Sequence, residues 1–296
     1  MKLPILLSVI SLTGLFASCS QKAETPRPDH IIVIMEENHG YDELIGSSNA
    51  PFINKLANES AIFTDAHGVT HPSQPNYLAL FSGSTQGVTG DDCLDKVSPY
   101  HTPNLGASLI KKGFTFKGYG QTMPSAGYMG CEYTKSSLTD LFLYARKHAP
   151  WVNWIGKGEN NIDASLSLPM TAFPKDFSKL PTVSFVIPDM DYDMHNIGKP
   201  GDAAAIQRGD QWLKDNLEAY VKWAKTHNSL LIVTFDEDDF KPINHIPTIF
   251  AGANIKIGQY DQKINHYHVL HTIEAMYGLP VEDDTKAETI TGIWKK

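Results

Sequence analysis

Residues 30–39 read "HIIVIMEENH", and this stretch decides the fold class. Its first part, residues 30–36, is a nearly continuous apolar run rich in β-branched residues. A run of this kind predicts a strand that is buried on both faces, as in a parallel sheet. Polar residues follow at once from Glu36 onward, and open parallel sheets bind their ligands outside the carboxyl ends of the strands. The stretch therefore predicts a central strand that delivers polar side chains to a binding crevice.

The same arrangement recurs along the chain. Residues 182–188, "TVSFVIP", and 229–235, "SLLIVTF", are two further apolar runs that end in acidic segments. Strand-like and helix-like segments alternate, with other strands predicted at 61–67, 114–120 and 247–252 and helices at 51–58, about 202–227 and 266–278. This alternation predicts a single α/β domain with a central, mostly parallel sheet and helices on both faces.

Another predicted helix is marked at both of its ends. Thr102 is the expected N-cap, Pro103 the first helical residue and Gly113 the terminator. Residues 84–101 and 120–180 show no such periodicity and are rich in Gly, Ser and aromatic residues. Segments of this kind commonly form the walls and lids of a pocket.

Composition narrows the possible functions. The chain has 296 residues, of which 42% are hydrophobic, and this is enough for a sizeable core. The formal net charge of -8 argues against nucleic acid as a partner, because phosphate backbones recruit basic surfaces. No repeat or long linker is present after residue 28, so we expect one domain over 29–296.

The N-terminus predicts export. Residues 1–18 combine an early lysine, a short apolar run and small residues, as in a secretory signal sequence. Cys19 follows "LFAS", which resembles a lipobox with Phe16 as an imperfect match, and residues 19–28 form a polar tether. We expect a periplasmic or cell-surface lipoprotein anchored to the membrane through Cys19. Cleavage near Ala17 to give a secreted protein is the alternative.

Two cysteines remain in the expected domain. An oxidising compartment and a single remaining pair favour a disulfide between Cys93 and Cys131. Two free buried thiols are the alternative that the spacing leaves open.

Three acidic clusters follow three predicted strands, over residues 36–39, 189–196 and 236–239. One such cluster is usually a helix cap or a solvated loop. Three at the same edge of a sheet would repel one another, and no basic run accompanies them. A bound divalent cation is the usual solution, and oxygen ligands with imidazole suit Zn, Mn, Mg or Ca.

Several histidines are candidates for the same crevice. His195 lies within the second acidic cluster, His245 precedes a strand, and His266 and His268 open the last helix. A histidine in the first turn of a helix is held neutral by the helix dipole, and the neutral form is the one that binds metals. The remaining histidines are expected to be structural or lie on the surface, with His148 left undecided: His30, His67, His227 and His271.

The stretch "VTHPSQPNYLALFSG", residues 69–83, contains a serine between two prolines. The prolines stop a regular helix or central strand from running through Ser73, and the apolar run after it is typical of a helix start. Ser73 is therefore expected at the N-terminal end of a helix, as an N-cap, a nucleophile or both. His71 is not expected to activate it.

From residue 29 onward the chain resembles a bacterial and fungal phosphoesterase family within the alkaline phosphatase superfamily, which includes acid phosphatases and phosphatidylcholine-type phospholipases C. Eight blocks occur in the family's order. They are "IVIMEENHGYDELIG", "HPSQPNYLALFSG", "YARKHAPW", "PDMDYDMHN", "RGDQWLKDNL", "LIVTFDED", "NHIPTIFAG" and "NHYHVLHTIEAMYGLP". The resemblance implies an alkaline phosphatase-like fold and a hydrolase acting on phosphoric esters.

The resemblance also implies roles for individual residues. Ser73 matches the phosphorylated nucleophile, which also contacts the metal. The implied metal ligands are Glu37, Asn38, Asp236, Glu237 and His195, with either Asp191 or Asp193. One or two metal ions are implied, with His266 completing a second site or contacting the phosphoryl oxygens. His195, His266 or His245 and the Asn76 amide would neutralise phosphoryl oxygens or protonate the leaving group.

The implied reaction is attack of Ser73 on phosphorus followed by hydrolysis of the phosphoserine. A sulfatase is disfavoured because Tyr77 replaces the arginine of the sulfatase signature, and a Ser-His-Asp hydrolase because Ser73 lacks the Gly-x-Ser-x-Gly elbow. We expect an acid phosphatase-type monoesterase acting on a small phosphate ester. Phospholipase C or phosphodiesterase activity on a phospholipid is the alternative, and a non-catalytic phosphate- or lipid-binding lipoprotein is the alternative of another class.

Overall fold

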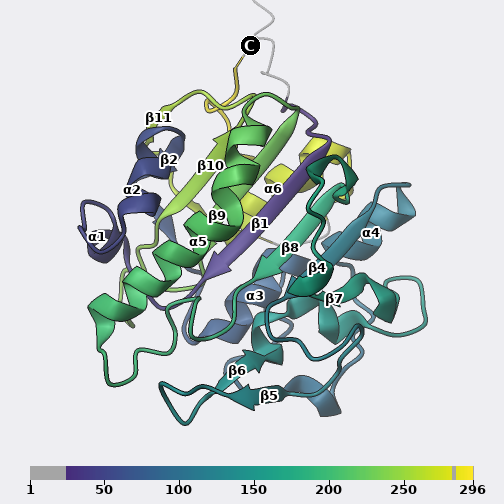
Figure 1. The fold of residues 1–296 in the computed structure, drawn as a ribbon. Helices are drawn as coiled ribbons and strands as arrows, with labels where there is room; N and C mark the ends of the chain where they lie inside the picture. The colour runs from purple at the N-terminus through teal and green to yellow at the C-terminus, as the bar shows by residue number, and fades with distance from the viewer. Residues whose placement is uncertain (1–24, 282–284, 296) are drawn as a thin grey trace, which may run out of the picture.

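The computed structural model describes residues 25–281 and 285–295. The expected signal sequence, Cys19 and the first part of the tether lie outside these residues. A single eight-stranded sheet dominates the structure (Figure 1). In spatial order its strands are β11 (Gly258–Tyr260), β2 (Ala61–Phe63), β10 (Thr248–Gly252), β9 (Ser229–Phe235), β1 (His30–Glu36), β8 (Val183–Ile187), β4 (Phe116–Gly120) and β7 (Ser167–Pro169).

Strand β1 lies in the middle of the sheet and pairs in parallel with both of its neighbours. Ile31 lies opposite Val183 of β8 and opposite Leu230 of β9. Strand β4 continues the parallel pairing on the side of β8, and β10 alone runs antiparallel to its partners. Residues 31–34 are fully buried, as expected of a strand covered on both faces. The predicted mostly parallel sheet is confirmed.

Helices cover both faces of the sheet (Figure 1). On one face α2 (Pro51–Asn58) packs against α5 (Asp202–Ala224). On the other, α3 (Ser73–Ser82) packs with α4 (Leu105–Lys111) and α6 (His266–Tyr277). The short helix α1 (Tyr41–Leu44) follows the polar segment after β1.

The segment predicted to be irregular contains several short elements. Strand β7 is the edge of the main sheet and was not predicted, because three residues are too few to show a period. Strands β5 (Glu132–Lys135) and β6 (Phe142–Ala145) form a hairpin. Elsewhere, the run predicted as one strand over 61–67 is divided, because β2 ends at Phe63 and β3 (Ala66–His67) pairs separately with β12 (Ile264–Asn265). The 3₁₀ helices are η1 (Leu94–Lys96), η2 (Arg146–His148), η3 (Pro150–Trp154), η4 (Ala164–Leu166), η5 (Met170–Ala172) and η6 (Phe177–Lys179).

The boundaries of two helices differ from those predicted. The N-cap of α4 is Asn104 and not Thr102, because the Asn104 side chain accepts a hydrogen bond from the backbone N–H of Ala107 at 2.9 Å. Thr102 instead donates to the side chain of Gln86. Helix α5 ends at Ala224, three residues earlier than predicted.

A disulfide joins Cys93 to Cys131, with the two Cα atoms 5.7 Å apart. It links the loop before η1 to the start of the β5–β6 hairpin. No helix in the described part of the chain is both long and apolar enough to cross a membrane.

Strand β4 packs against an indole so closely that only glycine fits at its centre. A Cβ added at Gly118 would lie 2.1 Å from Cε2 of Trp151. The indole is held by a hydrogen bond from its Nε1 to the hydroxyl of Ser167 and by edge contact with Phe185, so it has little room to move. We expect Gly118→Ala to lower the free energy of unfolding by about 1–3 kcal/mol, measured by urea denaturation.

Gly90→Ala is the matched control, because a Cβ at Gly90 meets nothing within 4 Å. Its unfolding midpoint should equal that of the parent protein. Equal midpoints for both variants would show that the indole moves freely.

Candidate active site

The structure brings the ends of the three central strands together. The backbone N–H of Glu37, after β1, donates to the carbonyl of Asp193, after β8, at 2.8 Å. The backbone N–H of Asn38 donates to Oδ1 of Asp236, after β9, at 3.0 Å. The first and third polar clusters therefore meet directly, and the second meets them through Asp193.

Ser73 lies among these carboxylates. It is the first residue of α3, buried, and its hydroxyl reaches Oε2 of Glu37 at 3.0 Å and Oε1 of Glu237 at 3.2 Å. The N-cap of the helix is Pro72, so Ser73 does not cap the helix with its side chain. Pro75 falls in the first turn, where a missing N–H breaks no helical hydrogen bond.

The turn before Ser73 is held by Asn76. Its Oδ1 accepts from the backbone N–H groups of Val69 and Thr70, and its Nδ2 donates to the carbonyls of Thr70 and Pro72. An amide has two donors and one acceptor oxygen, and all of them are used here. In this arrangement of the described residues the Asn76 amide therefore has no free N–H to offer to a phosphoryl oxygen, and Asn76 instead fixes the path of the chain into Ser73.

The oxygen donors around Ser73 fit a divalent cation. Oδ2 of Asp236 and Oδ1 of Asn38 are buried and have no hydrogen-bond partner among the described residues. Buried polar atoms are normally hydrogen-bonded. An oxygen atom that has no such partner and lies within a cluster of carboxylates is a suitable ligand for a metal ion. Together with Glu37 and Glu237, these residues can hold a cation beside the hydroxyl of Ser73.

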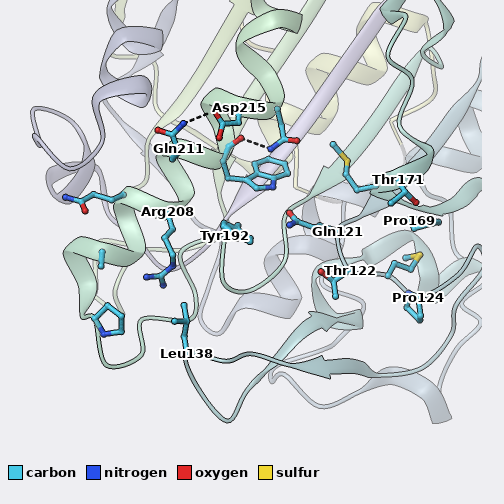
Figure 2. Close-up of a pocket in the computed structure, with 17 residues that line it drawn as sticks. Gln121, Thr122, Pro124, Leu138, Pro169, Thr171, Tyr192, Arg208, Gln211 and Asp215 are labelled. Atoms are coloured by element: carbon cyan, nitrogen blue, oxygen red, sulfur yellow. Dashed lines mark hydrogen bonds between the residues drawn. The ribbon is translucent and has the colours of Figure 1, made fainter.

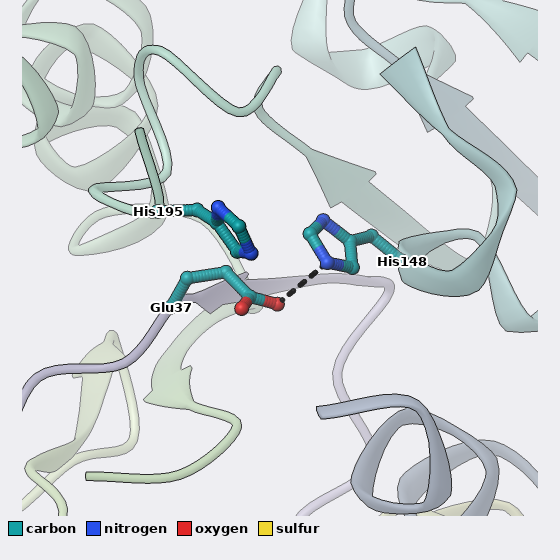
Figure 3. A group of neighbouring side chains, drawn as sticks. All are labelled: Glu37, His148 and His195. Atoms are coloured by element: carbon teal, nitrogen blue, oxygen red, sulfur yellow. Dashed lines mark ion pairs between the residues drawn. The ribbon is translucent and has the colours of Figure 1, made fainter. Parts of the chain in front are cut away.

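A second group of possible ligands consists of Glu37, His148 and His195, whose ligand atoms lie within 4.8 Å of one another (Figure 3). Nε2 of His148 lies 3.1 Å from Oε1 of Glu37, and its Nδ1 lies 3.3 Å from Oδ2 of Asp193. The His148 ring stacks on Tyr77, whose hydroxyl donates to Oε1 of Glu37 at 2.6 Å. His148 was left undecided from the sequence, because it comes from η2 and only tertiary packing places it here.

The two aspartates proposed as alternatives have different surroundings. Asp193 lies beside His148 and accepts from the backbone N–H of His195 at 2.9 Å. Oδ1 of Asp191 instead accepts from the hydroxyl of Ser136 and the amide of Asn196. Asp193 is therefore the better placed of the two to act in the site.

His266 and His245 occupy different positions. Nε2 of His266 donates to the carbonyl of Phe235, the residue before Asp236, and its Nδ1 is buried without a hydrogen-bond partner among the described residues. His266 therefore lies beside the end of β9, next to the residue that precedes Asp236. His245 stacks on Tyr41, and its Nε2 donates to the carbonyl of Thr64. No interaction among the described residues joins His245 to Ser73 or Glu37.

Two basic or titratable residues of the site were not identified as such from the sequence. His71 does not contact Ser73, and its Nδ1 lies 2.5 Å from Oε2 of Glu237. Lys147 is largely buried and forms an ion pair of 2.6 Å with Asp91, whose other oxygen accepts from the backbone N–H of Gln74. The positive charge that the sequence did not predict therefore comes from the residue directly before His148.

Burial and mutual repulsion keep protons on the carboxyl groups of the cation-free site. Burial raises the pKa of Asp236 to about 6. Burial, and then the charge of Asp236, raise the pKa of Glu237 to about 9. The pKa values of Glu37 and Asp193 are also raised, mainly by burial. A cation that binds here replaces these protons.

The imidazoles are neutral in the same environment. Burial, assisted by the charge of Lys147, lowers the pKa of His195 to about 4, and it shifts the pKa of His148 in the same direction. Burial lowers the pKa of His266 to about 4. Neutral imidazoles offer one donor and one lone pair each, which suits either a metal ion or a phosphoryl oxygen.

A wider groove lies on the far side of the loop that carries Asp191 and Asp193. It has a volume of about 1060 Å³ and runs between α5 and the loops after β4 and β7, with Tyr192, Arg208 and Gln121 on its walls (Figure 2). None of the described residues that contact Ser73 lines it. The groove is therefore separate from the site.

Comparison with known proteins identifies relatives of the whole domain. The model of a family described as the Phosphoesterase family matches residues 47–280. A phosphatidylinositol-3-phosphatase from Mycobacterium tuberculosis is 46% identical over 268 residues, which cover 90% of this chain and 82% of that protein. An acid phosphatase from Aspergillus fumigatus is 28% identical over 252 residues, covering 82% of this chain and 54% of that protein, so the chain spans about half the length of the fungal relative.

The solved structures support the fold. A protein in the alkaline phosphatase superfamily from Vibrio parahaemolyticus superposes with a TM-score of 0.56 over 86% of this chain and 67% of that chain. The two sequences are 14% identical, so this likeness shows the fold alone. The predicted alkaline phosphatase-like architecture is confirmed.

The buried carboxylates predict how stability depends on pH when the protein is freed of cations with EDTA. The pKa of Asp236 is raised from 3.8 to about 6 on folding, so its stabilising contribution is complete below pH 4 and is lost as the pH rises through 6. At pH 8 the free energy of unfolding is lower by about 3 kcal/mol at most through this loss. In EDTA at pH 8, Asp236→Asn should therefore raise the melting temperature by several degrees, measured by calorimetry, and at pH 4 it should not.

Asp239→Asn is the matched control, because Asp239 belongs to the same loop but is exposed and pairs with Lys241 at the surface. It should change the melting temperature little at either pH. A melting temperature of Asp236→Asn at pH 8 that stays at or below that of the parent would refute the argument that the buried, ionised Asp236 destabilises the fold.

Proposed function

The chain belongs to the Phosphoesterase family, and from this premise we propose that it hydrolyses phosphate monoesters with Ser73 as nucleophile and a divalent cation as cofactor. The observation that supports this best is the position of the Ser73 hydroxyl between Glu37 and Glu237, beside unpartnered oxygens of Asn38 and Asp236. A buried serine surrounded by acceptors and ligand atoms has no evident structural purpose.

In the proposed reaction, Oγ of Ser73 forms a bond to phosphorus while the bond to the ester oxygen breaks. The hydroxyl proton of Ser73 passes to one of the two carboxylates that accept its hydrogen bonds, Glu37 or Glu237. The alcohol leaves on the side opposite Ser73 and takes up a proton from solvent, and water then cleaves the phosphoserine to release phosphate and restore the hydroxyl. Hydrogen bonds to Glu37 and Glu237 orient the hydroxyl before attack. We expect His195, which burial keeps neutral, to donate to a phosphoryl oxygen. His148 would hold Glu37 and Asp193 in position, and Lys147 would add positive charge nearby.

The cation would be held by Glu37, Asn38, Asp236 and Glu237. When bound, it lowers the pKa of the serine hydroxyl and offsets the charge of the phosphoryl group. The four oxygen ligands favour a hard cation such as Mg, Mn or Ca over Zn. Glu37, His148 and His195 could hold a second ion, so we propose one or two metal ions per chain.

The proposed substrate is a small phosphate monoester, because both relatives above are named as phosphatases, one of a phosphoinositide and one an acid phosphatase. No observation on the described residues favours phosphodiester or phospholipase C activity, which stays the alternative. A non-catalytic phosphate- or lipid-binding role would leave the orientation of Ser73 without a purpose.

We also propose that the protein works outside the cytoplasm. The disulfide between Cys93 and Cys131 is of the kind that persists in oxidising compartments. Export and lipidation of Cys19 rest on the N-terminal sequence pattern, and mass analysis of the membrane fraction would test both.

The nucleophile is tested by Ser73→Ala. It should lower kcat on p-nitrophenyl phosphate by about 10³-fold or more, because water lacks the position and orientation of Oγ. Binding of the cation should persist, shown by a rise in melting temperature on addition of Mn²⁺. Ser84→Ala is the control, since Ser84 is an exposed serine just beyond α3, and full turnover by Ser73→Ala would rule out the covalent route.

The cofactor is tested by chelation. Dialysis against EDTA should abolish turnover, and one of Mg²⁺, Mn²⁺, Ca²⁺ or Zn²⁺ should restore it, with the bound ion counted by elemental analysis. Turnover that survives EDTA with no bound metal would contradict the proposal.

A further inference from the structure

A cavity of about 220 Å³ opens beside the active site, between the loop that carries Asp91 and the β5–β6 hairpin. His195 lines it and is also one of the three residues grouped around Glu37. Asp91 lines it as well and accepts from the backbone N–H of the residue after Ser73. The cavity is therefore in direct contact with the site on two sides.

The walls of the cavity are mostly apolar. Leu141, Phe142 and Ala145 come from the hairpin, and Met190 comes from the loop that also carries His195. The disulfide between Cys93 and Cys131 closes the remaining side and ties the two walls together. Met190 is joined to the hairpin by a hydrogen bond from its backbone N–H to the carbonyl of Leu143. The cavity is thus built by contacts that fix its shape.

The charges around the cavity leave no cation free for a second anionic group. Among the described residues that line it, Lys147 carries the positive charge, and it is paired with Asp91 at 2.6 Å. Glu132 adds a negative charge at the rim. An anionic alcohol group would therefore meet net negative charge.

The size of the cavity limits what it can hold. An engineered cavity of about 150 Å³ lined by apolar side chains binds one benzene molecule, so 220 Å³ admits one six-membered ring with small substituents. Two acyl chains would not fit inside it.

We propose that this cavity is the leaving-group subsite, and that it takes a compact, uncharged alcohol with one apolar ring face, such as an aryl alcohol. The inference rests on the proposed phosphatase function and adds the class of ester to it. In-line attack needs room for the alcohol beside the site, on the side of phosphorus away from Ser73. This cavity borders His195, whose ligand atom lies within 4.8 Å of that of Glu37, the carboxylate that the Ser73 hydroxyl contacts.

The test compares phenyl phosphate with ethyl phosphate in the parent protein and in Ala145→Leu, which places three more carbons in the cavity. Comparing variant with parent for each substrate cancels the difference in leaving-group reactivity. We expect the ratio of kcat/KM for phenyl over ethyl phosphate to fall about tenfold, the discrimination that a few carbons produce in an apolar pocket. The inhibition constant of inorganic phosphate, which has no leaving group, should be the same in Ala145→Leu as in the parent protein.

Ala204→Leu is the matched control. It makes the same change on α5, in the separate wide groove, and should leave the substrate ratio of the parent unchanged.

A second variant does not depend on packing. Leu141 is 46% exposed at the rim, so Leu141→Lys adds a positive charge without disturbing the core. It should raise kcat/KM for 4-carboxyphenyl phosphate relative to phenyl phosphate by about two- to fivefold, as expected for an exposed ion pair.

The outcomes separate this inference from the proposed function. Unchanged ratios in Ala145→Leu and Leu141→Lys, with the parent active on both esters, would overturn the subsite and leave the phosphatase function standing. A parent that hydrolyses neither ester with any of the four cations would overturn both. A tenfold fall in Ala204→Leu as well would also overturn the subsite.

Discussion

Four carboxylates, Glu37, Asp193, Asp236 and Glu237, are buried around one serine, and their repulsion is the constraint on which the rest of the site depends. Each carboxylate that leaves water must keep a proton, gain a hydrogen bond or meet a positive charge. Tyr77, His148 and His71 each supply a contact to one of the glutamates, and Lys147 supplies positive charge from the side. Among the described residues, Oδ2 of Asp236 and Oδ1 of Asn38 remain buried without a hydrogen-bond partner, and both belong to the region where a cation would sit. A bound cation, as proposed, would offset the electrostatic cost that these contacts leave uncompensated.

The fold can hold this arrangement because its centre is stiff. Strand β1 is hydrogen-bonded along its length to parallel strands on both sides, so the residues that follow β1, β8 and β9 leave the sheet at one edge. Backbone hydrogen bonds from Glu37 to Asp193 and from Asp236 to Glu36 then join the loops where they begin. The carboxylates cannot relax apart without breaking the central pairing. The hydrogen bonds of the sheet therefore hold the carboxylates together against their mutual repulsion.

The features that could be predicted from the sequence are those that depend on the order of neighbouring residues. The buried strands are β-branched runs, and the three acidic clusters are recognisable because each follows such a run. Within the second cluster the sequence left Asp191 and Asp193 as alternatives. His148 and Lys147 could not be placed, since they come from a segment with no periodicity and reach the site only through packing of η2 against α3. Asn76 was misjudged for another reason. Its side chain pairs with backbone groups of its own turn, and residue types do not reveal backbone partners.

The same aperiodic segment carries most of what distinguishes this site from a bare cluster of ligands. Residues 120–180 provide His148, Lys147, the hairpin that forms the cavity wall and one cysteine of the disulfide, whose other cysteine lies in the aperiodic segment 84–101. The residues that follow the central strands provide the carboxylate partners of Ser73. The disulfide joins residues 84–101 to residues 120–180, so the shape of these two segments does not depend on the sheet alone. Residues on the hairpin such as Leu141 can therefore change without disturbing Ser73 or Glu37. The residues after the central strands would therefore carry out the reaction, and the hairpin held by the disulfide would select the ester in the proposed subsite.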